Sequence, residues 1–218
     1  MMDCDSIARW YRWLEYLGFG RALERRREAF LGDVADARRV LALGDGDGRA
    51  LVALRKAMSA SATAVPYIDY VDISGKMLEL ARARAGTDVI AYHCDNALTC
   101  PLPDSEYDLI VTHFFLDCFE EKYLELLAAR VARAAAPRAR WVISEFRRSG
   151  WLVRCLYLFF RVTTGLRTAR LVDHHTVLTG YGFRLLRSES TWCGLLASEL
   201  WLRENPDRAS CILEGVGE

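Results

Sequence analysis

Hydrophobic positions along the chain follow two alternating periods. Short apolar runs typical of buried strands occupy residues 40–43, 64–72, 89–94, 107–113 and 139–146. The stretches between these runs carry helical spacing, and we expect Pro137 to stop the helix that precedes the fifth run. Because helices separate the successive strands, the pattern predicts a parallel sheet.

The last part of the chain departs from this alternation. Residues 182–190 and 194–204 indicate two strands joined by a short link, without a helix between them. An antiparallel C-terminal hairpin is therefore expected to complete a mostly parallel sheet of seven strands. We expect one domain, with a core over 39–146 and a lid helix plus the hairpin over 147–218.

Aromatic and apolar residues also gather outside the predicted core. Trp10, Tyr11 and Trp13 near the start predict an N-terminal helical cap over 1–38, in which an arginine-rich run is expected to face solvent. These rings either pack on the domain or cover an apolar substrate. An apolar helix at 152–160 is either a lid or the interface of a homodimer.

The composition limits the classes of partner that the chain is expected to bind. The chain has 218 residues, and its 29 Lys and Arg balance its 29 Asp and Glu. Because zero net charge argues against nucleic acid bound over a broad surface, a small substrate is expected. The chain has no apolar run long enough for a membrane span and no signal core at its start, so we expect a cytoplasmic protein.

Seven cysteines are present, without a CxxC pair and without a histidine at zinc spacing. We expect them to be reduced thiols, mostly packed in the core, and we predict neither a disulfide nor a metal site from them.

A glycine-rich turn, LGDGDG, lies between the first strand and the following helix. Glycines here allow the backbone to approach a ligand near the unpaired N–H groups of that helix. The pattern departs from a dinucleotide fingerprint at Arg49, and the two aspartates inside the turn would repel a pyrophosphate. A ligand with positive charge and no phosphate fits this turn better.

Two further acids follow the next strands. Asp72 ends the second run, where a carboxylate can accept hydrogen bonds from a ribose. Its alternative role is to cap the next helix, which Ser74 can do instead. Asp95 ends the third run and can face the base of a nucleoside, or else form an Asx turn.

These motifs, in this order, resemble the class I S-adenosylmethionine-dependent methyltransferases over residues 39–203. The resemblance implies an α/β, Rossmann-like, doubly wound fold and S-adenosylmethionine as cofactor, whose sulfonium suits the acidic turn. It places the three glycines of the turn at the methionine part and Asp72 at the ribose. Ile73 would pack on the adenine, Asp95 with Asn96 would face the adenine amine, and His113 with Phe114 would border the cofactor and the transfer site. The implied cofactor contacts are Gly44, Asp45, Gly46, Gly48, Asp72, Ile73, Asp95, Asn96, His113 and Phe114.

One position departs from the family pattern. Members commonly carry an acid two residues before the first glycine, where this chain has Ala42. Asp45 or Asp47 would then take over part of that role, or the amino-acid end of the cofactor would be held differently. The C-terminal portion loosely resembles small-molecule members of the family, which suggests an apolar substrate.

Methyl transfer depends mainly on alignment of the acceptor with the methyl group, and a general base helps some acceptors. Our candidate catalytic residues are His113 and Asp117, which follow the fourth strand, with Glu145 as a further candidate. His174 and His175 are adjacent, and neighbours on a helix point about 100° apart. Both are further candidate bases by position, but we do not expect both to enter one site, and we expect at least one to be solvated or to cap the helix.

The sequence thus predicts an S-adenosylmethionine-dependent methyltransferase acting on a small, apolar or aromatic acceptor. A noncatalytic S-adenosylmethionine-binding module is one alternative, for which Ala42 is the reason. An NAD-dependent oxidoreductase is another, and it would end in a parallel strand instead of a hairpin.

Overall fold

The computed structural model describes residues 21–61, 66–147, 173–191 and 194–204. The predicted helices around Trp10 and Trp13 lie outside the described residues, as does the apolar helix predicted at 152–160. The two alternatives for each of these segments therefore stay predictions.

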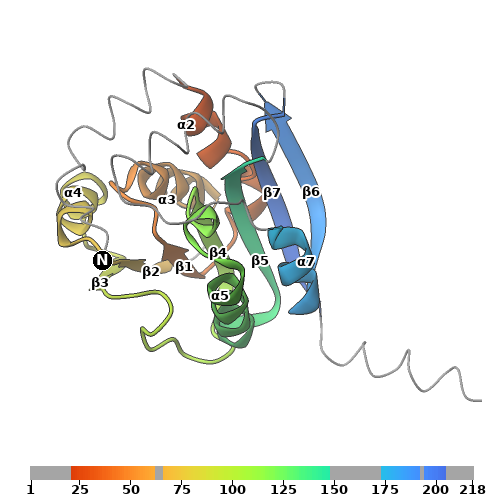
Figure 1. The fold of residues 1–218 in the computed structure, drawn as a ribbon. Helices are drawn as coiled ribbons and strands as arrows, with labels where there is room; N and C mark the ends of the chain where they lie inside the picture. The colour runs from red at the N-terminus through yellow and green to blue at the C-terminus, as the bar shows by residue number, and fades with distance from the viewer. Residues whose placement is uncertain (1–20, 62–65, 148–172, 192–193, 205–218) are drawn as a thin grey trace, which may run out of the picture.

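One mixed sheet forms the centre of the molecule (Figure 1). Its strands are β1 Arg39–Leu43, β2 Tyr67–Asp72, β3 Ile90–Cys94, β4 Tyr107–His113, β5 Ala135–Phe146, β6 Phe183–Thr191 and β7 Leu196–Arg203. They lie in the order β3-β2-β1-β4-β5-β7-β6, with β1 to β5 parallel and β7 antiparallel to both of its neighbours. The predicted seven-stranded sheet with a closing hairpin is confirmed. An antiparallel β7 contradicts the oxidoreductase alternative, which required a final parallel strand.

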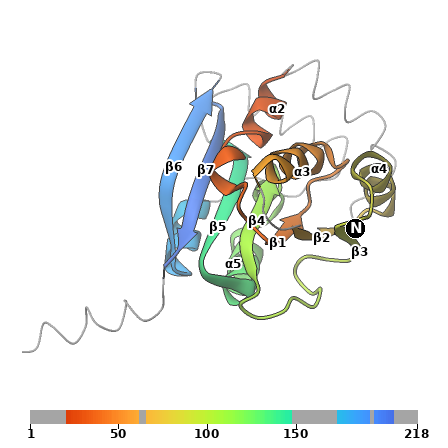
Figure 2. The same ribbon diagram turned by 180° about the vertical axis from the view of Figure 1, so that it is seen from behind.

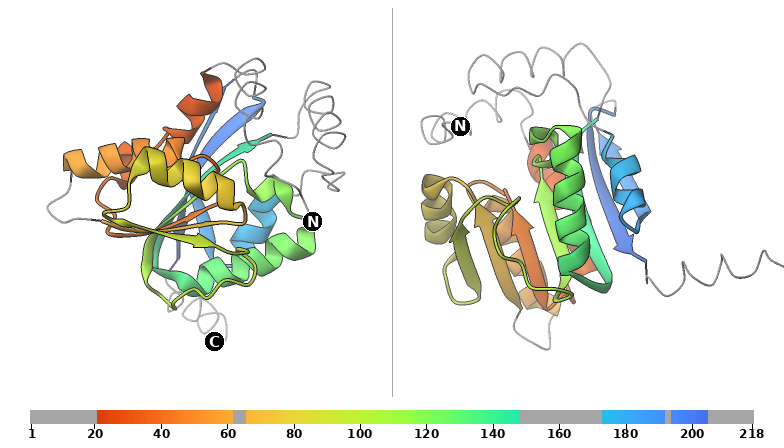
Figure 3. Two further views of the ribbon diagram at one scale, coloured as in Figure 1. Left: turned by 90° about the vertical axis from the view of Figure 1, so that its left-hand side faces the viewer. Right: turned by 60° about the horizontal axis from the view of Figure 1, so that its bottom comes forward.

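Helices cover both faces of the sheet, as the edge-on view in Figure 3 shows. The face toward the viewer in Figure 2 carries α2 Ala22–Arg27, α3 Arg49–Ser61 and α4 Gly75–Ala85. The opposite face carries α5 Glu121–Ala134 and α7 His174–Gly180. The described residues also form two short 3-10 helices, η1 Gly32–Val34 and η2 Leu116–Cys118. Within the described part of the chain, none of these helices has the length and apolar character that a bilayer crossing requires.

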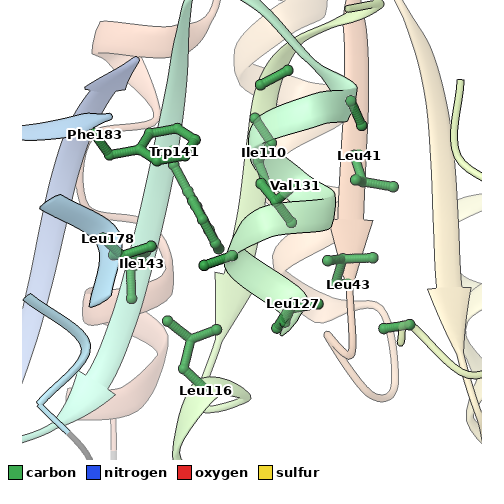
Figure 4. Packing of buried hydrophobic residues seen from close by; sticks show 14 of the residues in the cluster. Leu41, Leu43, Ile110, Leu116, Leu127, Val131, Trp141, Ile143, Leu178 and Phe183 are labelled. Carbon is green, nitrogen blue, oxygen red and sulfur yellow. The ribbon is translucent and has the colours of Figure 1, made fainter. Parts of the chain in front are cut away.

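The core on the α5 face is built around Trp141 of β5 (Figure 4). Its indole ring lies 5.2 Å from the ring of Phe183, and its Nε1–H donates to Thr112 Oγ1 over 3.0 Å. Leu127 and Val131 of α5 pack on the same strands and are fully buried. Burial of each large apolar side chain contributes about 1.5–3 kcal/mol, so this packing holds α5 against the sheet.

Helix α5 ends at Ala134, shortly before Pro137, as predicted, but β5 begins at Ala135, so the strand starts earlier than the predicted run and includes the proline. The pairing of β4 with β5 is interrupted between Tyr107 and Leu109, where the β5 residues after Ala135 bulge out until Arg140 resumes the register. A proline, which lacks an N–H group, is tolerated in a bulge because no ladder hydrogen bond is required there.

The expectation for the cysteines holds only in part. Cys100 is buried in the core, whereas Cys94 and Cys118 are exposed, and all three are free thiols. The reason is that β3 lies at the edge of the sheet and η2 at its rim, where side chains reach solvent.

Candidate active site

The glycine turn connects β1 to α3, and its three glycines have different surroundings. At Gly44 (φ +62°) a Cβ would lie 2.1 Å from Phe115 Cδ2, and at Gly48 a Cβ would lie 2.8 Å from the Cα of Ala81 in α4. Packing therefore requires glycine at both of these positions. Gly46 (φ +70°) has no atom within 4 Å of its would-be Cβ, and the Tyr70 hydroxyl donates to its carbonyl over 2.5 Å. The space beside Gly46 is therefore open within the described part of the chain.

The two aspartates of the turn differ in their partners. Asp47 is held by Arg49 at 3.0 Å and by Arg84 at 2.7 Å. Burial alone would raise its pKa, but the hydrogen bonds and charges of these two arginines lower the pKa of Asp47 below its usual value. Its carboxylate is thus already neutralised by protein groups.

Asp45 is buried, with 8% of its surface exposed. Its Oδ2 accepts from the Leu51 N–H over 3.2 Å, while its Oδ1 has no hydrogen-bond partner among the described residues. Burial raises the pKa of Asp45 to about 7, and the positive charge of Arg27 opposes that rise. A buried carboxylate oxygen with no protein donor is the group that a cationic ligand would satisfy.

Arg27 was not predicted from the sequence as a site residue. The hydroxyls of Ser144 and Ser198 donate to the Arg26 carbonyl over 2.8 and 2.7 Å, which fixes the end of α2 above β5 and β7. Arg27 is 7% exposed, and its guanidinium carbon lies 5.2 Å from the centre of the Phe114 ring. The prediction of a solvated arginine face is therefore wrong for this residue. Its position four residues after the buried Leu23 was the signal that could have placed it on the inner face.

Asp72 lies at the end of β2, as predicted, and is half-buried. Its Oδ1 accepts from the Ser74 N–H over 2.8 Å, while the Ser74 side chain caps α4 by accepting from the Met77 N–H over 3.3 Å. The charge of Asp72 makes a small contribution to the raised pKa of Asp45. Ile73 beside them is 62% exposed, which leaves an apolar surface next to the acid.

Asp95 continues this edge of the sheet from β3. Its N–H donates to the Asp72 carbonyl over 3.1 Å, which joins the ends of β2 and β3. Its Oδ1 accepts from the Asn96 N–H over 2.7 Å, and the Asn96 side chain accepts from the Leu98 N–H over 2.9 Å. The Asx turn considered for Asp95 is therefore made by Asn96. The backbones of Asp72 and Asp95 therefore lie side by side where β2 and β3 end.

His113 and Phe114 lie at the end of β4. His113 is 3% exposed, and neither ring nitrogen has a hydrogen-bond partner among the described residues. Burial, with a smaller contribution from Arg27, lowers the pKa of His113 to about 3, so the imidazole is neutral at physiological pH. Phe114 takes φ +53°, donates its N–H to the Ser144 carbonyl over 2.6 Å and packs on Phe146 at 5.0 Å. A non-glycine residue in this conformation is costly and is often found at functional sites.

Glu145 of β5 reaches under the start of η2. Its Oε1 accepts from the N–H groups of Phe115 and Leu116 over 3.0 and 2.8 Å, while Oε2 has no partner in the described part of the chain. Burial, together with the charge of the half-buried Asp117, raises the pKa of Glu145 well above its usual value. Glu145 therefore keeps its proton to a higher pH than an exposed glutamate does, and part of the cause is the charge of the candidate base Asp117.

The expectation for His174 and His175 is wrong. Both imidazoles contact one carboxylate, that of Glu199 on β7, with Nε2–O distances of 2.9 and 2.8 Å. Both residues belong to α7, so their side chains leave the backbone about 100° apart, yet each imidazole reaches a different oxygen of the same carboxylate: His174 contacts Oε2 and His175 contacts Oε1.

The chain is similar to known proteins at the level of a family model and of solved structures. Residues 40–138 match the model of a family described as methyltransferase domain. No curated protein sequence matches the chain.

Solved structures with this fold are numerous, and three are representative. A putative methyltransferase of Haloferax volcanii, in complex with the Trm112 methyltransferase activator, has a TM-score of 0.71 at 14% identity, over 94% of this chain and 99% of the other. The N-methyltransferase NodS from Bradyrhizobium japonicum WM9, in complex with S-adenosyl-L-homocysteine, has a TM-score of 0.64 at 16% identity, over 84% and 88%. An S-adenosylmethionine-dependent methyltransferase from Mesorhizobium loti has a TM-score of 0.61 at 22% identity, over 83% and 100%. At these identities, the likeness establishes a shared fold.

Proposed function

We propose that the chain transfers the methyl group of S-adenosylmethionine to a small, apolar or aromatic acceptor, a proposal that the match of residues 40–138 to a methyltransferase-domain family model supports. One observation carries the proposal: a buried Asp45 oxygen without a partner among the described residues lies in the same turn as the open backbone of Gly46. A cofactor with a cationic amino group and no phosphate complements this arrangement.

The amino-acid end of the cofactor is zwitterionic, and the site offers one charge of each sign. Asp45 would accept from the ammonium group through Oδ1, which replaces the acid missing at Ala42. Arg27 lies close enough to Asp45 to oppose the rise of its pKa, and it would bind the carboxylate of the cofactor. Charge-assisted contacts of this kind are the stronger class of hydrogen bond.

The nucleoside end would lie along the tips of β2 and β3. Asp72 would accept from the ribose hydroxyls, the exposed side chain of Ile73 would pack on the adenine, and Asp95 with Asn96 would face the adenine amine. The backbone bond from Asp95 to Asp72 fixes the distance between these contacts. This assignment follows the general rule that parallel sheets bind nucleotides at the carboxyl ends of their strands.

The transfer region would be bordered by the residues after β4. When bound, the cofactor supplies an electrophilic methyl group on a positively charged sulfur. His113 is neutral, so it would accept a hydrogen bond and orient the acceptor, whereas Asp117 is the better candidate for removing a proton. Phe114 and Phe146 would present apolar surface that excludes water from the methyl group.

Calorimetric titration of S-adenosylhomocysteine into the full chain tests the cofactor site. We expect saturable 1:1 binding, and Asp45→Asn should weaken it about 10- to 100-fold, the range expected for a hydrogen bond between charged groups. Asp47→Asn is the matched control, because that carboxylate already pairs with two arginines and should leave the affinity nearly unchanged. Arg27→Gln should weaken binding as Asp45→Asn does.

A second ligand separates the two ends of the site. 5′-Methylthioadenosine lacks the amino-acid end, so its affinity should not change in Asp45→Asn or Arg27→Gln. Absence of S-adenosylhomocysteine binding by the folded chain would refute the proposal. Binding without formation of S-adenosylhomocysteine from S-adenosylmethionine, across a panel of phenols, quinols, amines and thiols, would favour the noncatalytic alternative.

A further inference from the structure

A second cluster of polar side chains lies apart from the glycine turn, between α7 and β7. His174 and His175 open α7, and Glu199 occupies the middle of β7. Helix α7 lies on the same face of the sheet as α5, opposite the face that carries α3 and α4 (Figures 1 and 3). None of the three residues belongs to the set that we assign to the cofactor.

The cluster has the donor atoms of a transition-metal site. Two imidazole nitrogens and one carboxylate oxygen, one from each residue, all lie within 4.8 Å of one another. Around a tetrahedral zinc ion with bonds of about 2.0–2.2 Å, the ligand atoms would be about 3.3 Å apart. At present His174 Nε2 lies 2.9 Å from Glu199 Oε2 and His175 Nε2 lies 2.8 Å from Oε1. Side-chain rotations that bring the ligand atoms from within 4.8 Å of one another to this spacing would admit the ion. In the ion-free protein, a proton joins each histidine to the carboxylate.

Neighbouring groups hold these ligands in place. Glu199 is 2% exposed, and its Oε2 also accepts from the Trp201 Nε1–H over 3.0 Å. The ring of His175 lies 5.0 Å from the Trp201 ring and 4.8 Å from the ring of His174. A buried carboxylate that a neighbouring N–H group orients in this way is typical of zinc sites.

One nearby group opposes a cation. Arg147 Nη2 lies 3.7 Å from Glu199 Oε1, and the same nitrogen donates to Ser188 Oγ over 2.7 Å. Its side chain is 45% exposed, so solvent partly screens its charge. Removal of this arginine should therefore tighten the binding of a cation.

We propose that His174, His175 and Glu199 form a site for a divalent ion of the zinc type, with two nitrogens and one oxygen from the protein and water completing the coordination. Two histidines with one glutamate form a known ligand set for zinc sites that keep one position open. The ion would join α7 to β7, and this proposal does not depend on the proposed methyl transfer.

Zinc titration of the full chain, first treated with a chelator and then freed of it, tests the site. Exposed thiols are blocked with iodoacetamide beforehand, because Cys94 and Cys118 could bind zinc by themselves. We expect one equivalent to bind, a higher melting temperature with zinc, and visible absorption bands of a four- or five-coordinate ion when cobalt replaces zinc.

Variants identify the ligands. His174→Ala and His175→Ala should each weaken zinc binding at least about tenfold, and Arg147→Ser should tighten it. His93→Ala is the matched control, since His93 pairs with Asp69 at 2.8 Å in the same manner but without a second histidine. Circular dichroism verifies that each variant is folded.

Two results would overturn the proposal. One is the absence of a zinc equivalent in the folded, thiol-blocked chain. The other is an affinity that falls as much in His93→Ala as in the α7 variants, which would show an adventitious ion only. If one of the alanine variants fails to fold, His175→Gln replaces it, because His175 is the more exposed of the two histidines. The His175→Gln variant should also lose the cobalt bands. Retained bands would refute the assignment.

Discussion

Asparagine in place of Asp45 should stabilise the cofactor-free protein while weakening its cofactor site. The pKa of this buried carboxyl rises from 3.8 to about 7 on folding. A group that binds its proton more tightly in the folded chain loses stability as pH rises, here between pH 3.8 and pH 7. At 1.36 kcal/mol for each tenfold change, the difference amounts to about 4 kcal/mol at pH 8 and about 2 kcal/mol at pH 5.

Asp45→Asn removes this cost and keeps an oxygen that can accept from the Leu51 N–H. The variant should therefore be more stable than the parent, by about 10 °C in melting temperature at pH 8 for a chain of this size and by about half that at pH 5. Urea denaturation followed by tryptophan fluorescence, without cofactor and at both pH values, gives the free energies of unfolding.

Asp47→Asn serves as the control with the opposite sign, because its carboxylate has a lowered pKa and gains from two arginines. That variant should lose stability. If Asp45→Asn and the parent unfold at the same urea concentration at pH 8, the carboxyl is not ionised in a buried setting. If the gap between them is the same at pH 5 and pH 8, titration of Asp45 is not its cause, and the reasoning is refuted.

Three further predictions concern the same region. The affinity for S-adenosylhomocysteine should rise up to about tenfold per pH unit from pH 5 to pH 7, as Asp45 ionises, while that for 5′-methylthioadenosine stays flat; calorimetry at each pH measures both. Gly44→Ala should lower the free energy of unfolding by at least about 2 kcal/mol, because the new Cβ would clash with Phe115. Gly46→Ala should lower it by about 1 kcal/mol and mainly weaken S-adenosylhomocysteine binding. Urea titration measures the change in stability, and calorimetry measures the change in binding. Glu145→Gln should melt above the parent, by a margin that widens from pH 5 to pH 8, and should leave S-adenosylhomocysteine binding unchanged.

Features encoded in local spacing could be predicted from the sequence. The run 107–113 coincides with β4, and Ser74 caps α4 as expected, because both depend on residues a few positions apart. The order of the acids at the strand ends followed from the parallel topology. These local signals were sufficient for the sheet and for the edge that carries Asp72 and Asp95.

Features that depend on distant packing could not be predicted in the same way. Glu199 meets His174 because β7 inserts between β5 and β6, and no spacing in the chain indicates a pair 25 residues apart. The burial of Arg27 depends on two serines of other strands that hold the end of α2. The requirement for glycine at position 44 arises from Phe115, which lies beyond three intervening strands in the sequence.

The insertion of β7 also dictates when the sheet can be completed during synthesis. Of the seven strands, β7 is the last to leave the ribosome, and it joins β5 to β6. The edge of β5 therefore stays unpaired until residue 203 has been made. Unpaired edges with large apolar side chains invite association between nascent chains. A chain released before Leu196 would expose Trp141 and Val142 at such an edge, and its fate would be aggregation or chaperone capture, not a smaller functional domain.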